Sequence, residues 1–355
     1  MIAMTGLKIL LGLSGLTAIS AAVLFFETIL VDLQHYLILL TGILLLHTLW
    51  ISSHAHCLSQ RSLALILGLS LLGTLFLTTR EPPMFKVITE EPRLALAAKN
   101  LSLQRWAAVA DQGMIQNHEL IIKQPYLDKH PLVFPSLLAT LHDITGHNPD
   151  NVFRLNIALT FILLALVAYL GLQLHGLSGA VGVIALLINV PLLAQQATSG
   201  SLEILHLLLL AGVLAAAQRY LTQPDTPRLT LLLLSGALLA QVRTESALLL
   251  LPVALIAYWG WWQHRNLRLN LSLALLPLLL LPVAVHLLWV RQWPSGLNWG
   301  NALSINLFTA LEYYLKLDLL ASMNAALGWL ILLGLLAFSY ICLRSLFQGK
   351  RPDAL

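Results

Sequence analysis

Long apolar runs dominate this chain and limit the folds open to it. The hydrocarbon core of a bilayer is about 30 Å thick, and a helix needs about 20 mostly apolar residues to cross it. Runs of this kind lie near residues 7–27, 36–52, 62–79, 153–174, 179–196, 202–221, 229–243, 246–262, 269–290 and 323–346. We therefore expect an all-α integral membrane protein with a bundle of roughly ten transmembrane helices.

The composition supports lipid as the solvent of these helices. Hydrophobic residues make up 58% of the chain and charged residues only 10%, whereas a soluble domain has about 25% charged residues. A soluble chain of 355 residues cannot hide so much apolar surface, so membrane lipid is an expected partner. The net charge of +4 is small and scattered, which argues against a nucleic-acid partner.

The sequence contains no pattern typical of a metal or redox site. Cys57 and Cys342 fall near helix ends expected in the cytoplasm, where a disulfide does not persist. No His, Cys or carboxylate cluster has metal-ligand spacing. We therefore expect no cofactor, although the sequence leaves a divalent ion open.

The distribution of Lys and Arg predicts one orientation. The first run extends to about residue 27, which is long for a cleaved signal peptide, so we interpret it as a retained helix. With a cytoplasmic N-terminus, the short outer loops 28–35 and 197–201 have no Lys or Arg, as the positive-inside rule requires. The expected cytoplasmic ends and loops collect Lys8, Arg61, Arg219, Arg228, Arg265, Arg268, Arg344, Lys350 and Arg351. The C-terminus is then cytoplasmic, and the large loop 80–152 and the segment 291–322 face outward.

The large outer loop contains helix signals. Pro92 suits the first turn of a helix that ends at Gly113, and the apolar spacing between them predicts an amphipathic helix on the membrane surface. A second helix can begin only at about Pro135, and Gly146 ends it. We expect a helical loop of two surface helices with polar residues at their joints.

The residues of this loop carry a family resemblance. The stretch KHPLVFPSLLATLHDITGHNPDNVFRLN and the upstream TEEPRLALAAKNL resemble the first outer loop of the GT-C glycosyltransferases. The most similar branch contains the protein mannosyltransferases and the lipid A aminoarabinose transferase. The residues that match are Lys129, His130, Pro131, Leu132, Pro135, Gly146 and Arg154, with Glu90 and Glu91 where an Asp-Glu pair is usual.

The resemblance implies a function and a location. Enzymes of this superfamily transfer a sugar from a polyprenyl-phosphate donor to a glycan, lipid or protein acceptor at the outer face. It implies an inverting, direct transfer. We expect a bacterial inner membrane as the location, and the outer side is then the periplasm. The expected division is 1–60 for two extra N-terminal helices, 61–346 for the membrane domain, and 347–355 for a cytoplasmic tail.

The chain departs from the family pattern at three points. Glutamate replaces the usual aspartate, two extra helices are expected before the helix that enters the loop, and we expect no soluble C-terminal domain after the last helix. The last two departures point to a diverged member or to one that depends on a partner membrane subunit.

The chemistry of such a transfer selects the candidate residues in the loop. A carboxylate must act as general base toward the acceptor hydroxyl, and cations must stabilise the leaving phosphate. Glu90 or Glu91 is the expected base, and Asp128 is the second candidate. The alternatives are helix-start carboxylates for the glutamates and a turn residue for Asp128.

Basic and acidic residues elsewhere are the candidates for substrate binding. Lys129 and His130 can hold the donor phosphate or contact lipid headgroups. Arg154 can bind phosphate or extend to headgroups. Arg243 and Glu245 interrupt two apolar runs, where charges must pair or face a wet cavity, and Glu203 is expected to join them.

Two other functions stay open. A non-catalytic membrane subunit would bind the lipid-linked sugar without transferring it. A transporter or flippase would show polar residues deep in the membrane, and here the charges gather at helix ends.

Overall fold

The computed structural model describes residues 2–24, 33–53, 59–88, 90–116, 119–128, 130–264 and 270–292. The chain divides into two units, Met1–Leu288 and Trp289–Leu355. Almost all of the described residues belong to the first unit. The expected helix at 323–346, the segment beyond residue 292 and the tail lie outside the described residues.

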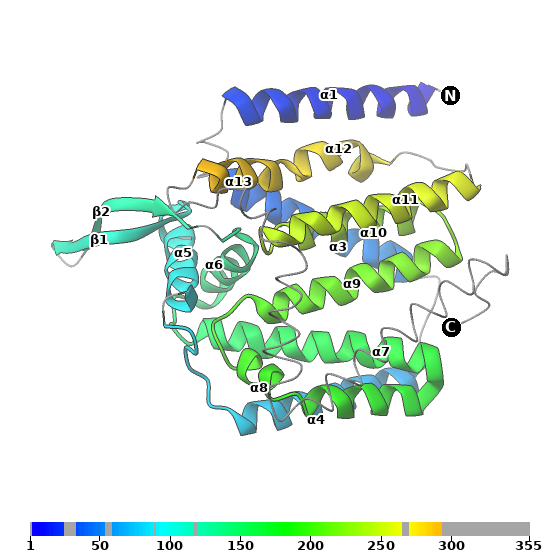
Figure 1. Ribbon diagram of the computed structural model, residues 1–355, viewed down its shortest axis with the longest axis horizontal. Helices are drawn as coiled ribbons and strands as arrows, with labels where there is room; N and C mark the ends of the chain where they lie inside the picture. Colours follow the sequence, from blue (N-terminus) through cyan, green and yellow to red (C-terminus); the bar gives the residue numbers. More distant parts are fainter. Residues whose placement is uncertain are drawn as a thin grey trace, which may run out of the picture. The chain divides into compact units, whose positions relative to one another are not determined.

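Long apolar helices form the body of this unit (Figure 1). They are α1 (Ile2–Leu24), α3 (Gln34–Ser53), α4 (Gln60–Arg80), α7 (Asn151–Ile188), α9 (Glu203–Thr222), α10 (Thr226–Ala240), α11 (Leu250–His264), α12 (Leu271–Leu279) and α13 (Leu281–Gln292). A 3-10 turn, η2 (Glu245–Leu249), precedes α11, and the short helix α8 (Pro191–Ala197) precedes α9. Within the described residues, each of the nine expected runs before residue 292 overlaps a helix.

Six of these helical segments are long and apolar enough to cross a membrane, within the described residues. They are Gln34–Ser52, Gln60–Arg80, Asn151–Ile188, Glu203–Thr222, Glu245–Trp262 and Leu271–Leu288. The expectation of a helical membrane protein is therefore confirmed. The expected number of roughly ten is not established, because α1 and α10 contribute shorter apolar stretches, Leu7–Ser20 and Thr226–Ala240.

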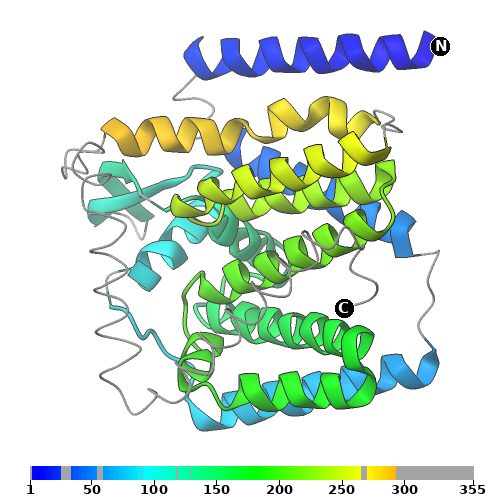
Figure 2. The ribbon, with the colours of Figure 1, turned by 45° about the vertical axis from the view of Figure 1, so that its right-hand side comes forward.

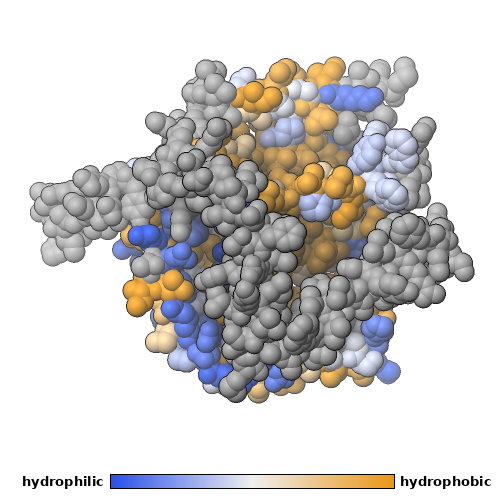
Figure 3. All heavy atoms as spheres, in the orientation of Figure 1, coloured by the Kyte–Doolittle hydropathy of each residue, from blue (hydrophilic) through white to orange (hydrophobic). Residues whose placement is uncertain are grey.

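The outer surface of the helices is apolar. Leu46, Leu72 and Leu186 are about two-thirds exposed, which would be unfavourable for so many large side chains in water. Tyr258, Trp259 and the neighbouring tryptophans are exposed near the end of α11, where an interfacial aromatic belt belongs. Figure 3 shows hydrophobic residues over the middle of the visible face and hydrophilic residues toward the end that carries α5.

Helix α7 reverses direction within its length. His175 and Gly176 have non-helical backbone angles, with φ of +63° at Gly176, a conformation that glycine adopts without strain. The two arms then lie so close that a Cβ on Gly171 would come within 2.6 Å of the Gly179 carbonyl oxygen. The expected separate runs at 153–174 and 179–196 are thus the two arms of a helical hairpin, the second continued by α8.

The close approach in α7 predicts a specific loss of stability. Gly171→Ala should lower the free energy of unfolding by about 1–3 kcal/mol, because the methyl group meets backbone that cannot move aside. Gly182→Ala is the matched control, since nothing lies within 4 Å of its Cβ position and alanine favours helix. Thermal unfolding in detergent measures both variants. An equal melting temperature for the two would contradict the hairpin.

The segment between α4 and α7 gathers at one end of the helices, here called the loop end (Figures 1 and 2). It contains α5 (Glu90–Gln104), an antiparallel hairpin of β1 (Ala108–Gln116) and β2 (Glu119–Leu127), and α6 (Val133–Thr145). The expectation of a purely helical loop is therefore corrected. The first helix ends at Gln104 rather than Gly113, because Arg105 takes a positive φ of 57° and turns the chain into β1.

The apolar face of α5 is buried by α6 rather than exposed to a membrane surface. Leu94 and Leu101 of α5 join the same core cluster as Leu138 of α6. Asp143 on α6 accepts hydrogen bonds from Ser102 and Arg105, each at 2.6 Å. The two helices thus form one packed layer at the loop end. The second helix begins two residues earlier than expected, at Val133, and Gly146 follows its last turn with φ of +83°, as the sequence predicts.

Candidate functional site

Glu91 is a buried anchor for the chain around it. Its side chain lies in the first turn of α5, and the residue is only 1% exposed. Its carboxylate accepts three backbone N–H groups, from Lys86 and Val87 at 3.1 Å and from Gly200 at 2.7 Å. The carboxylate therefore ties the segment after α4 to the loop before α9.

Other contacts hold these two segments to each other and to α7. The Met84 N–H donates to the Thr198 carbonyl at 3.1 Å, and the Phe85 ring packs on Phe153 with centroids 5.2 Å apart. Asn156 of α7 donates its amide N–H groups to the carbonyls of Ser199 and Ser201, at 2.7 and 2.8 Å. The TSGS loop at 198–201 is thus held by hydrogen bonds with Met84, Glu91 and Asn156. A network satisfied in this way makes this part of the loop end rigid.

Glu90, next to Glu91 in sequence, has a different environment. Its side chain is 47% exposed, and its Oε1 lies 4.0 Å from Nε2 of His130. The opposite ring nitrogen of His130, Nδ1, lies 3.3 Å from Oδ2 of Asp128, whose side chain is 4% exposed. His130 therefore stands between two carboxylates, one exposed and one buried, and a proton on Nδ1 would donate to Asp128 and orient the ring.

The charged residues at the joint of α10 and η2 also meet. Arg243 donates to Glu203 of α9 at 2.9 Å, and its Nε lies 3.8 Å from Glu245. His206 Nε2, one turn along α9 from Glu203, lies 3.0 Å from the Ser246 hydroxyl. The structure thus contains the salt bridge that was one of the two alternatives, and Glu203 joins it as expected. The other alternative, that these charges line a substrate cavity, stays a prediction, because none of the three lines the pocket described next.

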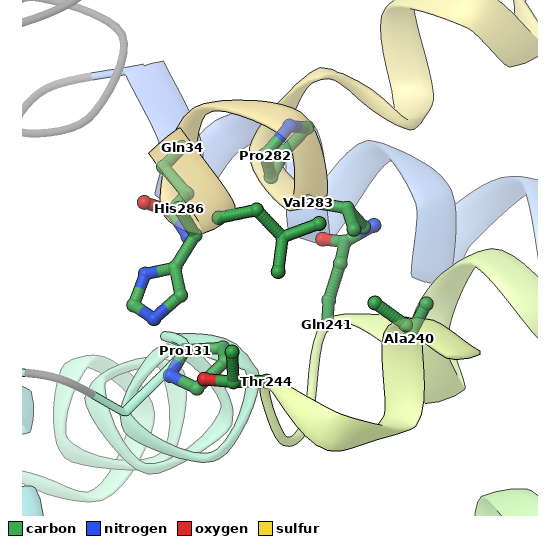
Figure 4. A pocket seen from close by; sticks show the side chains of 10 residues that line it. Gln34, Pro131, Ala240, Gln241, Thr244, Pro282, Val283 and His286 are labelled. Atoms are coloured by element: carbon green, nitrogen blue, oxygen red, sulfur yellow. The ribbon is translucent and has the colours of Figure 1, made fainter. Parts of the chain in front are cut away.

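Figure 4 shows a small pocket at the loop end. Two of its lining residues are chain neighbours of the charged residues described above. Its wall includes Pro131, which follows His130, and Thr244, which stands between Arg243 and Glu245. The complete lining is Gln34, Pro131, Ala240, Gln241, Thr244, Ala247, Pro282, Val283, His286 and Leu287. Its cavity volume is about 10 Å³, room for about one water molecule, and α3, α10, η2 and α13 meet there with the segment before α6.

The pocket contains buried polar atoms that have no protein partner in the described part of the chain. Gln34 is 1% exposed, and neither its amide nitrogen nor its amide oxygen makes a hydrogen bond there. Gln241 donates to the Leu279 carbonyl at 3.1 Å, while its amide oxygen is likewise unpaired. Because an unpaired buried polar atom costs about 1–3 kcal/mol, these amides indicate a site for a hydrogen-bonding ligand or water.

The structure leaves two of the sequence candidates outside this arrangement. Arg154 lies in the first turn of α7 with an exposed side chain, and the described contacts do not join it to either charged group. Lys129 lies outside the described residues. Of the remaining candidates, Glu91 is the buried anchor described above and belongs to neither charged group. Glu90, Asp128 and His130 form one group, and Glu203, Arg243 and Glu245 form the other.

Sequence reasoning missed the polar lining of the pocket. Gln34 and Gln241 adjoin apolar runs, Thr244 lies between two recognised charges, and His286 interrupts a run. A polar group next to an apolar run needs a partner, as a charge does. These residues could have been identified from the sequence on that ground. The sequence does not show that Gln34, Gln241 and His286, from three separate parts of the chain, line one pocket.

The electrostatics at the joint of α6 and α7 predict a pH effect. Burial and, after it, the neighbouring His147 lower the pKa of His142 below its ordinary 6.5, and Asn151 lies 3.1 Å from its Nδ1. The unfolded chain therefore binds a proton more readily than the folded chain, so stability is lost as pH falls through about 6.5. We expect faster hydrogen exchange, corrected for its intrinsic pH dependence, in α6 at pH 5.5 than at 7.5.

His142→Gln is the control for this effect, because glutamine keeps a polar side chain and does not titrate. The variant should show a smaller difference between the two pH values, and the remainder is expected from His147, whose pKa is also lowered by burial. The nearby Asp143 does not confuse the result: burial alone would raise its pKa, but the bonds from Ser102 and Arg105 lower it below 3.8. An unchanged pH response in the variant would refute the assignment to His142.

The described residues include no group of three or more His, Cys, Asp or Glu side chains placed to hold a metal ion. Comparisons of the chain with protein-family models, curated proteins and solved structures find no match. The function therefore has to be argued from the geometry of the loop end.

Proposed function

We propose that this membrane protein is a glycosyltransferase that moves a sugar from a polyprenyl-phosphate donor to an acceptor hydroxyl. The observation that carries the proposal is the placement of His130 between Glu90 and Asp128, directly before the pocket residue Pro131. It combines an exposed carboxylate, a positioned imidazole and a polar pocket at one end of a membrane bundle. The sequence resemblance to GT-C enzymes supports the same reaction.

Glu90 suits the role of general base better than Glu91. Its half-exposed carboxylate can meet an acceptor hydroxyl, whereas the oxygens of Glu91 already accept three backbone N–H groups. In the proposed step the acceptor oxygen attacks the anomeric carbon and its proton passes to Glu90. The bond from that carbon to the phosphate oxygen breaks, which inverts the anomeric centre and releases polyprenyl phosphate.

The other groups would assist this step through charge and orientation. Asp128 holds His130 through the 3.3 Å contact, so His130 is a positioning residue for Glu90 or, when protonated, a cation for the phosphate. Arg243 is half-exposed beside Glu203 and Glu245 and can stabilise the leaving phosphate. These two carboxylates would keep Arg243 in place before the donor arrives.

The neutral pocket, about 10 Å³ in volume, has room for about one water molecule, which would bridge its amides to a sugar hydroxyl bound beside it. Amides of Gln34 and Gln241 and the hydroxyl of Thr244 can each donate and accept, and the proline and aliphatic residues of the wall offer apolar contact. A ligand that forms hydrogen bonds with every buried amide of the site binds more tightly and more specifically than one that leaves an amide without a partner. The proposal places the loop end at the outer face of a bacterial inner membrane, with both termini in the cytoplasm and a partner subunit allowed.

Purified protein in liposomes with radiolabelled polyprenyl-phosphate sugars tests the proposal. We expect label to leave the donor and appear in an added glycan, lipid or peptide acceptor, with release of polyprenyl phosphate. Saturable donor binding without turnover would favour the non-catalytic subunit. Movement of the intact donor across sealed vesicles would favour a flippase, and the absence of both binding and turnover for all donors would overturn the proposal.

A further inference from the structure

A second, basic pocket lies at the other end of the helices. It is lined by Ser52 at the end of α3, by Arg219, Thr222 and Gln223 at the end of α9, and by Arg228 and Leu231 of α10. Its cavity volume is about 120 Å³, against about 10 Å³ for the pocket at the loop end. None of these residues takes part in the proposed reaction, so the pocket requires its own explanation.

Both arginines are held in place by the protein. Arg219 donates to the Tyr169 hydroxyl at 2.6 Å, and its guanidinium lies 5.4 Å from the centre of that ring. Arg228 donates through Nη1 to the Gln223 carbonyl at 3.0 Å and lies 3.1 Å from Asp225. Fixed guanidinium groups lose little freedom when they bind a ligand, which favours binding of an anion.

The charge of the pocket is not balanced within the described part of the chain. Two guanidinium groups line it, and Asp225 is the one carboxylate paired with either of them there. Asp225 also caps α10 by accepting the Arg228 backbone N–H at 2.8 Å, so part of its capacity is used. A further negative charge is therefore favoured in the pocket.

Ser52 points to the kind of anion. Its hydroxyl is buried and has no hydrogen-bond partner among the described residues. A hydroxyl beside two guanidinium groups matches a phosphate, whose oxygens accept bidentate bonds from arginine and a bond from a serine O–H. A carboxylate ligand has only two oxygens and would satisfy fewer of these donors.

We infer that this pocket binds the phosphate group of an anionic phospholipid, or of a small phosphate ester with the same chemistry. The position at the ends of α3, α9 and α10 is the level at which lipid headgroups lie around a membrane helix. Bound phosphate would neutralise the arginines, satisfy Ser52 and tie three helix ends together. This inference does not depend on the proposed glycosyl transfer.

Native mass spectrometry of the full chain tests the inference with phosphatidylglycerol, phosphatidylcholine and inorganic phosphate as probes. We expect at least one saturable phosphatidylglycerol site that phosphatidylcholine occupies more weakly. Arg228→Gln and Ser52→Ala should each weaken this site, the arginine variant by roughly tenfold. Arg219→Lys keeps the charge but loses bidentate geometry and should weaken it less than Arg228→Gln.

Arg61→Gln is the matched control, since Arg61 is an exposed cation in the first turn of α4 and does not line the pocket. It should leave the site unchanged. Saturation by inorganic phosphate at similar concentrations would assign the site to soluble phosphate esters, and phosphatidylglycerol binding alone would assign it to lipid. Equal binding of every probe by the wild type, Arg228→Gln and Ser52→Ala, with unchanged melting temperatures, would overturn the inference.

Discussion

Glu90→Gln should reduce sugar transfer by roughly 10²–10⁴-fold, the range expected when a general base is removed. The amide cannot take the proton of the acceptor hydroxyl. Its size and exposure are nearly those of the carboxylate, so the fold should be unaffected and donor affinity should change little. Steady-state transfer by the reconstituted protein, together with a donor-binding isotherm, separates turnover from binding.

Glu81→Gln is the control for Glu90→Gln. Glu81 is another partly exposed carboxylate at the loop end, and it pairs with Lys86 at 3.0 Å in a contact of small energetic value. It should retain turnover. Full activity in Glu90→Gln combined with loss of activity in a folded Asp128→Asn variant would move the base to Asp128.

Glu91→Ala should have its largest effect on stability rather than chemistry. The substitution removes the acceptor of three backbone N–H groups in a site that is 1% exposed. Each buried donor left unpaired costs about 1–3 kcal/mol, so we expect a loss of roughly 3 kcal/mol or more. The loss should appear in thermal unfolding and in rapid hydrogen exchange at 81–88 and 198–201.

A second substitution tests the same anchor without changing charge. Gly200→Ala would place a Cβ 2.8 Å from the Phe85 ring and 3.3 Å from Cβ of Glu91, so it should separate the same two segments. Glu90→Ala is the control, because that neighbouring carboxylate is half-exposed. A Glu91→Ala protein as stable as Glu90→Ala would show that the anchor does not hold the loop end.

The difference between these two adjacent glutamates was not accessible from sequence. Both belong to the acidic pair at the start of the first loop helix, and sequence reasoning treated them as equivalent bases. Gly200, which binds one of them, is 109 residues further along the chain. Only the packing of α5 against the TSGS loop decides which glutamate is buried and which faces outward.

The β-hairpin shows a similar limit within the loop. The apolar spacing through Ala108 and Val109 also fits a helix, and the periodic pattern alone favoured one that ends at Gly113. The left-handed Arg105 ends the helix early, and an arginine is not a residue that predicts such a conformation. Gly146 and the helix before it were predictable, because glycine at a helix end is a strong local signal.

Local sequence was enough to predict a helical membrane protein and the approximate positions of its long apolar helices. The physical reason is local: a run of about 20 apolar residues must satisfy its backbone within one helix in lipid, whatever its neighbours are. Tertiary structure alone decided that His130 lies between Glu90 and Asp128, and that Gln34 and Gln241 share a pocket. Such meetings depend on the rotation and packing of helices distant in the chain, which no local pattern of hydrophobicity specifies.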